Sequence, residues 1–371
     1  MPSNVISETD GKSKRPSDSA FKQQRLPAWQ PILTASTVLP TFFVIGIAFI
    51  PVGIVLLNIS DQVQEFSYDY TDCTNSKGVL CSQVEKDDCT CTIPFTLNHS
   101  FEGEVMMFYG LTNFYQNHRR YVKSRDDNQL RGKLSDTPSS DCQPFAYGDN
   151  KKPVVPCGAI ANSLFSDELS LLYEGKPVPL LNIGIAWPSD KTIKFRNPPG
   201  DLKLAFQNYS KPKNWKKNLW ELDPNNTDNN GLQNEDLIVW MRTAALPTFR
   251  KLYRRVNHQV DPFKSGLPKG NYTLVVQYSY QVKSFEGKKK MILSTTSHLG
   301  GKNPFLGIAY IVVGAICFLL GIVFLFIHIK CGKSLSNSED KTMSHEPCGN
   351  DWNPPNYLVP LRKHPMGSRA V

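Results

Sequence analysis

Two long apolar segments near the ends of the chain determine how everything between them is arranged. Val38–Leu57 and Pro304–Ile327 contain no charged residue. Each is long enough to cross the hydrocarbon layer of a bilayer, about 30 Å thick, as a helix of roughly 20 residues. Two spans place both tails on one side of a membrane and the middle on the other. We therefore predict transmembrane helices at 32–59 and 304–329, separated by one large domain at 60–303.

The charges that flank the first segment predict its orientation. Basic residues precede it and acidic residues follow it: Lys12, Lys14, Arg15, Lys22 and Arg25, then Asp61, Glu65, Asp69 and Asp72. Basic flanks stay in the cytosol, so we expect cytosolic tails at 1–31 and 330–371 and a lumenal or extracellular domain between the spans. We interpret the first span as an uncleaved signal-anchor. Trp29 is expected at the membrane interface, with docking to a partner as the alternative.

The tail at 330–371 is polar and rich in proline, without apolar periodicity, so we expect it to be disordered. The net charge of +9 is spread along the chain. Because the largest segment is predicted to lie outside the cytosol, this charge does not indicate a nucleic-acid partner.

Six of the nine cysteines lie in the middle domain, an even number in a compartment that favours disulfides. Cys89 and Cys91 are too close in sequence to pair comfortably with each other. We favour a nested arrangement in which Cys73–Cys91 encloses Cys81–Cys89, with Cys142–Cys157 separate. The last pair would add about 3 kcal/mol by the chain-entropy argument. The alternative is that these are free buried thiols.

Four glycosylation sequons also lie in the middle domain. They begin at Asn98, Asn208, Asn225 and Asn271. A fifth, at Asn58, is expected to lie too near the bilayer for modification. One sequon is weak evidence because the pattern is common by chance, but four well clear of the membrane agree with the predicted topology.

The middle domain is predicted to be β-rich and sandwich-like, with antiparallel strands and long loops. Alternating apolar residues indicate a strand at Asn271–Phe285, a turn at Glu286-Gly287 and a returning partner strand at Met291–Thr296. Val105–Phe108 and Ile238–Met241 are also predicted strands. After Pro247 the spacing of four apolar residues predicts a basic amphipathic helix: Phe249, Leu252, Tyr253 and Val256.

Glycines recur every seven residues in both spans. Gly307, Gly314 and Gly321 form one stripe, and Gly46 and Gly53 form another. Seven residues is nearly two helical turns, and glycine in lipid lets a second helix approach closely. Neither span core contains an ionisable residue of the kind that marks transport pathways. We therefore predict that the spans are built for helix packing and not for conduction.

No motif in the sequence indicates catalysis or a resident cofactor. Gly-x-Ser-x-Gly, His-Glu-x-x-His and P-loop patterns are missing from the sequence. The stretch Asp228–Gly231 resembles part of a calcium-binding loop, but Leu237 falls where the bidentate glutamate belongs. We predict a protein that is not an enzyme and binds neither metal nor cofactor.

Several long stretches resemble the accessory β-subunits of type IV P-type ATPases, the phospholipid flippases, known as the cell cycle control protein 50 family. They occur in order from the N-terminal tail to the second span: Phe21–Pro31, Asn113–Asp127, Pro156–Asp167, Gly184–Trp187, Lys194–Pro199, Asn234–Arg254 and Gly300–Ile311. The resemblance implies a heterodimer with the ATPase α-subunit. It also implies export of that ATPase from the endoplasmic reticulum to the Golgi, secretory vesicles or plasma membrane, and movement of phospholipid toward the cytosolic leaflet.

The resemblance further implies that the glycine stripes face the membrane helices of the ATPase. The sequence departs from the family pattern at Pro188 and His298, where tryptophan is usual, and at Pro94-Phe95-Thr96, where a sequon is usual. These departures indicate a divergent paralogue. Two other classes of protein fit the layout of spans and cysteines: a two-span receptor or adhesion glycoprotein, and a ligand-gated channel subunit. A channel should line its pore with polar residues, which these spans lack.

Overall fold

The computed structural model describes residues 17–26, 34–84, 89–297 and 299–338, with side chains up to residue 330. Trp29, His298 and most of the predicted C-terminal tail lie outside the described residues. The chain divides into two compact units, which we describe separately. One contains most of the two terminal helices, and the other, Val55–Gly307, is called the central domain below.

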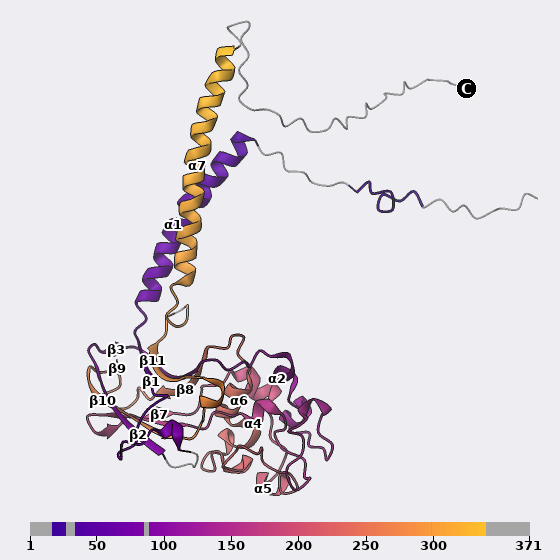
Figure 1. Ribbon diagram of the computed structural model, residues 1–371, viewed down its shortest axis with the longest axis vertical. Helices are drawn as coiled ribbons and strands as arrows, with labels where there is room; N and C mark the ends of the chain where they lie inside the picture. Colours follow the sequence, from indigo (N-terminus) through magenta and orange to yellow (C-terminus); the bar gives the residue numbers. More distant parts are fainter. Residues whose placement is uncertain (1–16, 27–33, 85–88, 298, 339–371) are drawn as a thin grey trace, which may run out of the picture. The chain divides into compact units, whose positions relative to one another are not determined.

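Helices α1 (Ala35–Asp61) and α7 (Phe305–Ser338) are both long and apolar enough to cross a membrane. They overlap the two spans predicted at 32–59 and 304–329 over residues 35–59 and 305–329. Within their unit they lie side by side (Figure 1). Proline occurs twice inside α1, at Pro40 and Pro51.

The central domain is built on two antiparallel sheets. The five-stranded sheet has the order β1-β11-β4-β8-β7, and the four-stranded sheet has the order β2-β10-β5-β6. The strands of the first are β1 (Glu65–Asp69), β11 (Lys289–Thr295), β4 (Val105–Leu111), β8 (Phe249–Val256) and β7 (Leu180–Leu181). Those of the second are β2 (Cys89–Leu97), β10 (Gly270–Tyr278), β5 (Glu168–Tyr173) and β6 (Lys176–Pro177). A short third ladder joins β3 (Phe101–Glu102) to β9 (Gly266–Leu267).

Alternating side chains from both large sheets form one hydrophobic core. Leu274 and Val276 on β10 belong to the same buried cluster as Met107 on β4 and Leu293 on β11. Because side chains alternate along a strand, each sheet turns one apolar face toward this core. The predicted β-rich, sandwich-like fold is therefore confirmed.

Short helices occupy the long connections on the other side of the central domain from the strands (Figure 1). They are α2 (Arg119–Lys123), α3 (Asp127–Leu130), α4 (Ala159–Asn162), α5 (Leu202–Ala205) and α6 (Glu235–Met241), with a π-helical turn η3 (Asp190–Lys194). Single 3-10 turns occur at Cys81–Gln83, Ser140–Cys142, Leu219–Glu221, Thr227–Asn229, Gly231–Gln233 and Lys283–Phe285.

The predicted basic helix after Pro247 is wrong, because Phe249–Val256 is strand β8. A β-bulge explains the misleading pattern. Met107 pairs with Arg254 while Phe108 pairs with Leu252, so Tyr253 is an extra residue in β8. The bulge changes the spacing of buried positions from two residues to three, which imitates the period of a helix.

The predicted strand at Ile238–Met241 is also wrong, because these residues end helix α6. The side chain of Asn234 accepts a hydrogen bond from the Leu237 N–H and caps the helix. Most of the helix is buried, so its sequence is apolar on several sides and lacks the polar face that identifies a helix.

The strand predicted at Asn271–Phe285 is shorter than expected, since β10 ends at Tyr278. The turn at Glu286-Gly287 exists, and Glu286 adopts a left-handed conformation. However, β11 does not return beside β10. It pairs with β1 and β4 in the other sheet, while β10 pairs with β2 and β5. The strand predicted at Val105–Phe108 is confirmed as part of β4.

Candidate functional site

The glycines of the two spans pack α1 against α7. A Cβ atom added to Gly46 would lie 2.9 Å from the Phe318 Cβ, and one added to Gly314 would lie 2.9 Å from the Ile50 Cγ1. One added to Gly321 would lie 3.3 Å from the Phe43 ring. Gly53 and Gly307 are buried as well. The expectation that these stripes face an ATPase is therefore corrected for Gly46, Gly314 and Gly321, whose neighbours belong to the same chain.

The sides of the two helices away from this contact remain apolar and exposed. On α1 they include Val44 and Ile47, and on α7 Val313, Leu319 and Phe326. Such a surface is suited to lipid or to another membrane helix.

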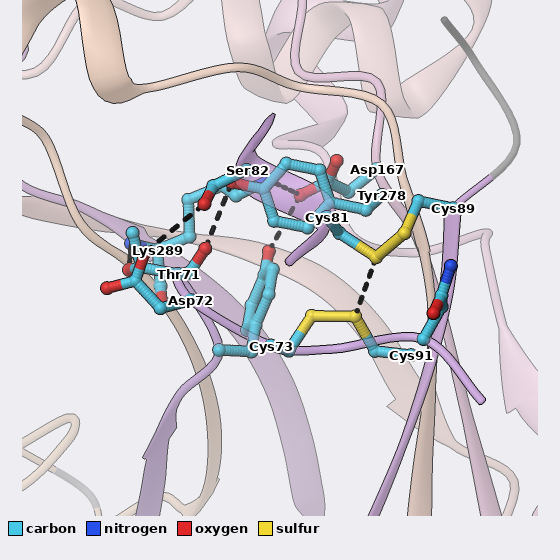
Figure 2. The surroundings of a disulfide bond; sticks show 12 residues. Thr71, Asp72, Cys73, Cys81, Ser82, Cys89, Cys91, Asp167, Tyr278 and Lys289 are labelled. Carbon is cyan, nitrogen blue, oxygen red and sulfur yellow. Dashed lines mark hydrogen bonds and ion pairs between the residues drawn. A yellow bond between two sulfur atoms is a disulfide. The ribbon is translucent and has the colours of Figure 1, made fainter. Parts of the chain in front are cut away.

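Three disulfides join the pairs favoured from the sequence. Cα–Cα distances are 6.0 Å for Cys73–Cys91, 5.4 Å for Cys81–Cys89 and 5.6 Å for Cys142–Cys157. The first two lie in contact, with Cys91 Sγ 3.3 Å from Cys81 Sγ (Figure 2). They tie the loop after β1 to strand β2. Cys317 is free, whereas the side chains of Cys331 and Cys348 lie outside the described residues.

Beside these disulfides a buried ion pair joins the two sheets (Figure 2). Lys289 on β11 donates to Asp167, just before β5, at 2.6 Å, and both side chains are fully buried. The Tyr70 hydroxyl donates to the same carboxylate oxygen at 3.1 Å. The other oxygen accepts the N–H groups of Ser279 and Tyr280, each at 2.6 Å. This carboxylate is therefore satisfied on both oxygens.

Burial and the charge of Asp167 shift the pKa values of Lys289 and Tyr70. Burial lowers the pKa of Lys289 to about 8, and Asp167 opposes the shift. Burial also raises the pKa of Tyr70 well above its usual value, and the adjacent Asp167 adds to the rise. Tyr70 therefore stays neutral and acts as a hydrogen-bond donor.

Helix α6 brings together stretches that are far apart in the sequence. The Trp240 indole donates to the Ile160 carbonyl at 2.7 Å, and the Ala244 N–H donates to the Gln116 side chain at 2.9 Å. The Glu235 carboxylate accepts the N–H groups of Ile185 and Ala186 at 2.7 and 2.9 Å, and also pairs with Lys191. Its pKa is lowered by these contacts although burial acts in the opposite direction.

A lysine from the neighbouring strand closes the C-terminal end of α6. The Lys251 Nζ donates to the carbonyls of Val239, Trp240 and Arg242 at 3.0, 2.6 and 2.7 Å. These carbonyls have no partner further along the helix, and a cation suits the negative end of the helix dipole. Among the described residues no carboxylate pairs with Lys251, and burial lowers its pKa to about 7.

A cavity of about 300 Å³ opens next to the same helix; we call it the basic cavity. Its apolar lining residues are Leu130, Phe195, Ile238 and Met241. Its charged lining combines four cations with two carboxylates: Arg125, Arg131, Lys194 and Arg242, with Asp127 and Asp190. The chemistry of this lining suits the binding of an anion beside an apolar group. It does not resemble a catalytic arrangement.

The four asparagines of the central sequons are all exposed. Asn271 lies on β10, and its side-chain oxygen accepts a hydrogen bond from Thr96 at 2.8 Å. The predicted glycans at Asn98, Asn208, Asn225 and Asn271 stay predictions. The stretch Asp228–Gly231, which resembled a calcium loop, forms part of two consecutive 3-10 turns.

Comparison with known proteins identifies the family. A sequence model described as the LEM3 (ligand-effect modulator 3) family / CDC50 family matches residues 56–334. The chain belongs to the CDC50 family. It is 55% identical to cell cycle control protein 50A of Mus musculus over 90% of this chain and 94% of that protein. It is 47% identical to cell cycle control protein 50B of Homo sapiens, over 87% and 96% respectively. Identity to cell cycle control protein 50C of Mus musculus is 42%, over 88% and 97%.

Four of the stretches that carried the resemblance to the CDC50 family are joined by the contacts around α6: Asn113–Asp127, Pro156–Asp167, Gly184–Trp187 and Asn234–Arg254. Sequence reasoning missed the basic cavity, however, because its four cations come from three segments: Arg125 and Arg131 flank α3, Lys194 ends η3, and Arg242 follows α6. No spacing within the sequence indicates that these residues meet. Pro188, one of the departures, precedes η3, and its carbonyl accepts the Thr192 hydroxyl.

Proposed function

We propose that this chain is a non-catalytic accessory subunit of a type IV P-type ATPase. In this role it forms a heterodimer with the ATPase α-subunit and enables that subunit to fold and leave the endoplasmic reticulum. It then remains in the complex that moves phospholipid toward the cytosolic leaflet. The observation that carries the proposal is the family match, which runs from 56 to 334 and so covers the central domain and nearly all of α7.

The surface of the helix pair is consistent with such a partner. Since three of the packing glycines are already covered by the other helix of the chain, the partner would contact the remaining exposed apolar faces. In the proposed topology both tails are cytosolic and the central domain, with its three disulfides, faces the lumen or cell exterior. The complex would leave the endoplasmic reticulum for the Golgi, secretory vesicles and plasma membrane.

Co-expression with each type IV ATPase, in cells that lack other subunits of this family, tests the proposal. We expect one or more ATPases to co-purify with this chain and to leave the endoplasmic reticulum only when it is present. Maturation of the glycans on this chain reports the same exit. A chain that matures alone and recovers no ATPase would contradict the subunit role and favour a cell-surface receptor.

A further inference from the structure

The basic cavity has more positive than negative charge, and one of its cations is unpaired. Arg125 pairs with Asp127 at 3.0 Å, and Lys194 pairs with Asp190 at 2.6 Å. In contrast, the Arg131 guanidinium makes neither an ion pair nor a hydrogen bond with any residue in the described part of the chain, and it is exposed. Four cations face two carboxylates, so the cavity can accept further negative charge.

Arg242 is another cation of the cavity, and the residues around it hold it in place. Its guanidinium lies 5.2 Å from the centre of the Trp187 ring and 3.9 Å from the buried carboxylate of Asp190. Arg242 directly follows α6, whose C-terminal carbonyls are held by Lys251. A cation that is already positioned loses little freedom when a ligand binds, which favours affinity.

An exposed apolar surface adjoins the cavity. Trp187, which stacks on Arg242, is 64% exposed, and Ile193 in η3 is 63% exposed. Tryptophan and arginine are the residues most often found at the energetic centre of protein–protein interfaces. An anion that binds the cavity and carries an apolar neighbour would therefore cover both surfaces at once.

We propose that the basic cavity binds an acidic segment of a partner polypeptide. One carboxylate of the segment lies between Arg131 and Arg242, and an adjacent apolar side chain covers Trp187. One observation favours a peptide carboxylate over a phosphate group. The lining includes Asp127 and Asp190, which repel a multiply charged anion more strongly than a singly charged one. The partner is the ATPase of the proposed function, so the identity of the partner in this inference rests on that function.

Arg131→Glu is the decisive variant, because Arg131 makes no ion pair within the described chain whose loss would disturb folding. Full-length protein is co-expressed with the ATPase that the wild type recovers. We expect Arg131→Glu to reduce the recovered ATPase by about tenfold, because it replaces the attraction between a guanidinium and a carboxylate with a repulsion between two carboxylates. Arg131→Lys, which keeps the positive charge, should recover nearly as much ATPase as the wild type. Lys176→Glu, on exposed strand β6, is the matched control and should recover as much as the wild type.

A second experiment uses the purified full-length chain without an ATPase. The probe is a labelled hexapeptide of alternating glutamate and leucine, with a glutamine–leucine peptide, inorganic phosphate and anionic lipid vesicles as comparisons. Of these four probes, we expect only the acidic peptide to bind the wild type. This binding should weaken as the NaCl concentration rises from about 0.05 to 0.3 M, because salt screens exposed charges. Arg131→Glu should abolish it.

The outcomes separate this inference from the proposed function. If the wild type recovers an ATPase and Arg131→Glu recovers equally much, the accessory role stands and the cavity proposal is overturned. If the wild type recovers no ATPase, the accessory role fails, and the peptide experiment then decides whether the basic cavity binds an acidic segment. Peptide binding that depends on Arg131 then supports the cavity proposal. Preference for phosphate or vesicles, or no binding at all, overturns it.

Discussion

At the scale of single residues, two buried lysines have different means of compensating their charge. Lys289 has a carboxylate partner in Asp167 and a nearby aromatic ring in Tyr278, 3.1 Å from its Nζ to the ring centre. Within the described part of the chain, Lys251 has only carbonyl oxygens and the rings of Trp240 and Phe249. The first joins the two sheets, and the second holds the end of α6. Their substitution should therefore have different consequences.

Lys289→Met should destabilise the chain by about 3–5 kcal/mol, because it leaves the Asp167 carboxylate buried without its countercharge. The midpoint of thermal unfolding of the detergent-purified chain measures the effect. Lys288→Met, at the exposed neighbouring position, is the control and should change stability little. An unchanged midpoint for Lys289→Met would show that the ion pair does not support the contact between the sheets.

Lys251 should make stability depend on pH. Its pKa is lowered to about 7 in the folded chain, against 10.5 for an ordinary lysine. Between these values the unfolded chain binds more protons than the folded chain, so stability rises with pH. We expect the unfolding midpoint of the wild type to rise more between pH 7 and pH 9 than that of Lys251→Met. Lys176→Met should follow the wild type, and parallel curves for all three proteins would contradict the assignment.

At the scale of elements, the two terminal helices are packed against each other through glycine. The close approach of Gly46 to Phe318 and of Gly314 to Ile50 leaves no space for a larger side chain. Three aromatic contacts between α1 and α7 add to this glycine packing: Phe42–Phe324, Phe43–Phe318 and Phe49–Tyr310. The helix pair is therefore a preformed surface that the proposed membrane partner would meet as a unit.

Gly314→Leu should separate the helices and cost about 1–3 kcal/mol through overpacking. Cysteines introduced at Phe49 and Tyr310, in a background of Cys317→Ala, report the separation. Oxidative cross-linking in membranes should fall severalfold in Gly314→Leu. Val313→Leu, at an exposed position on the same helix, should cross-link normally. Equal cross-linking in both variants would mean that Gly314 does not control the contact.

At the scale of the whole molecule, the central domain should face the lumen with its four sequons exposed. Removal of N-glycans by a glycosidase should increase the gel mobility of the wild type. Replacing Asn98, Asn208, Asn225 or Asn271 by Gln should each remove one glycan. Asn58→Gln, beside the membrane, should leave the mobility unchanged. A wild type without glycans would place the domain in the cytosol and contradict the proposed orientation.

The sequence alone determined the features that depend on neighbouring residues. A helix must satisfy its own backbone in lipid, so the length of an uninterrupted apolar run identifies each span. The short distance between Cys89 and Cys91 restricted their pairing, and the alternation around Val105 indicated strand β4. The family stretches indicated the function class, since long motifs in fixed order are specific.

Only the tertiary structure decided the features that depend on contacts between distant segments. A bulge opposite β4 made β8 resemble a helix, and burial of α6 removed its polar face. The partners of β11 came from strands far earlier in the chain, although β10 was nearer in sequence. The basic cavity likewise collects cations from three segments. Sequence spacing reports the local period of the backbone, whereas the position of a sheet neighbour or a charge in space follows from how the whole chain packs.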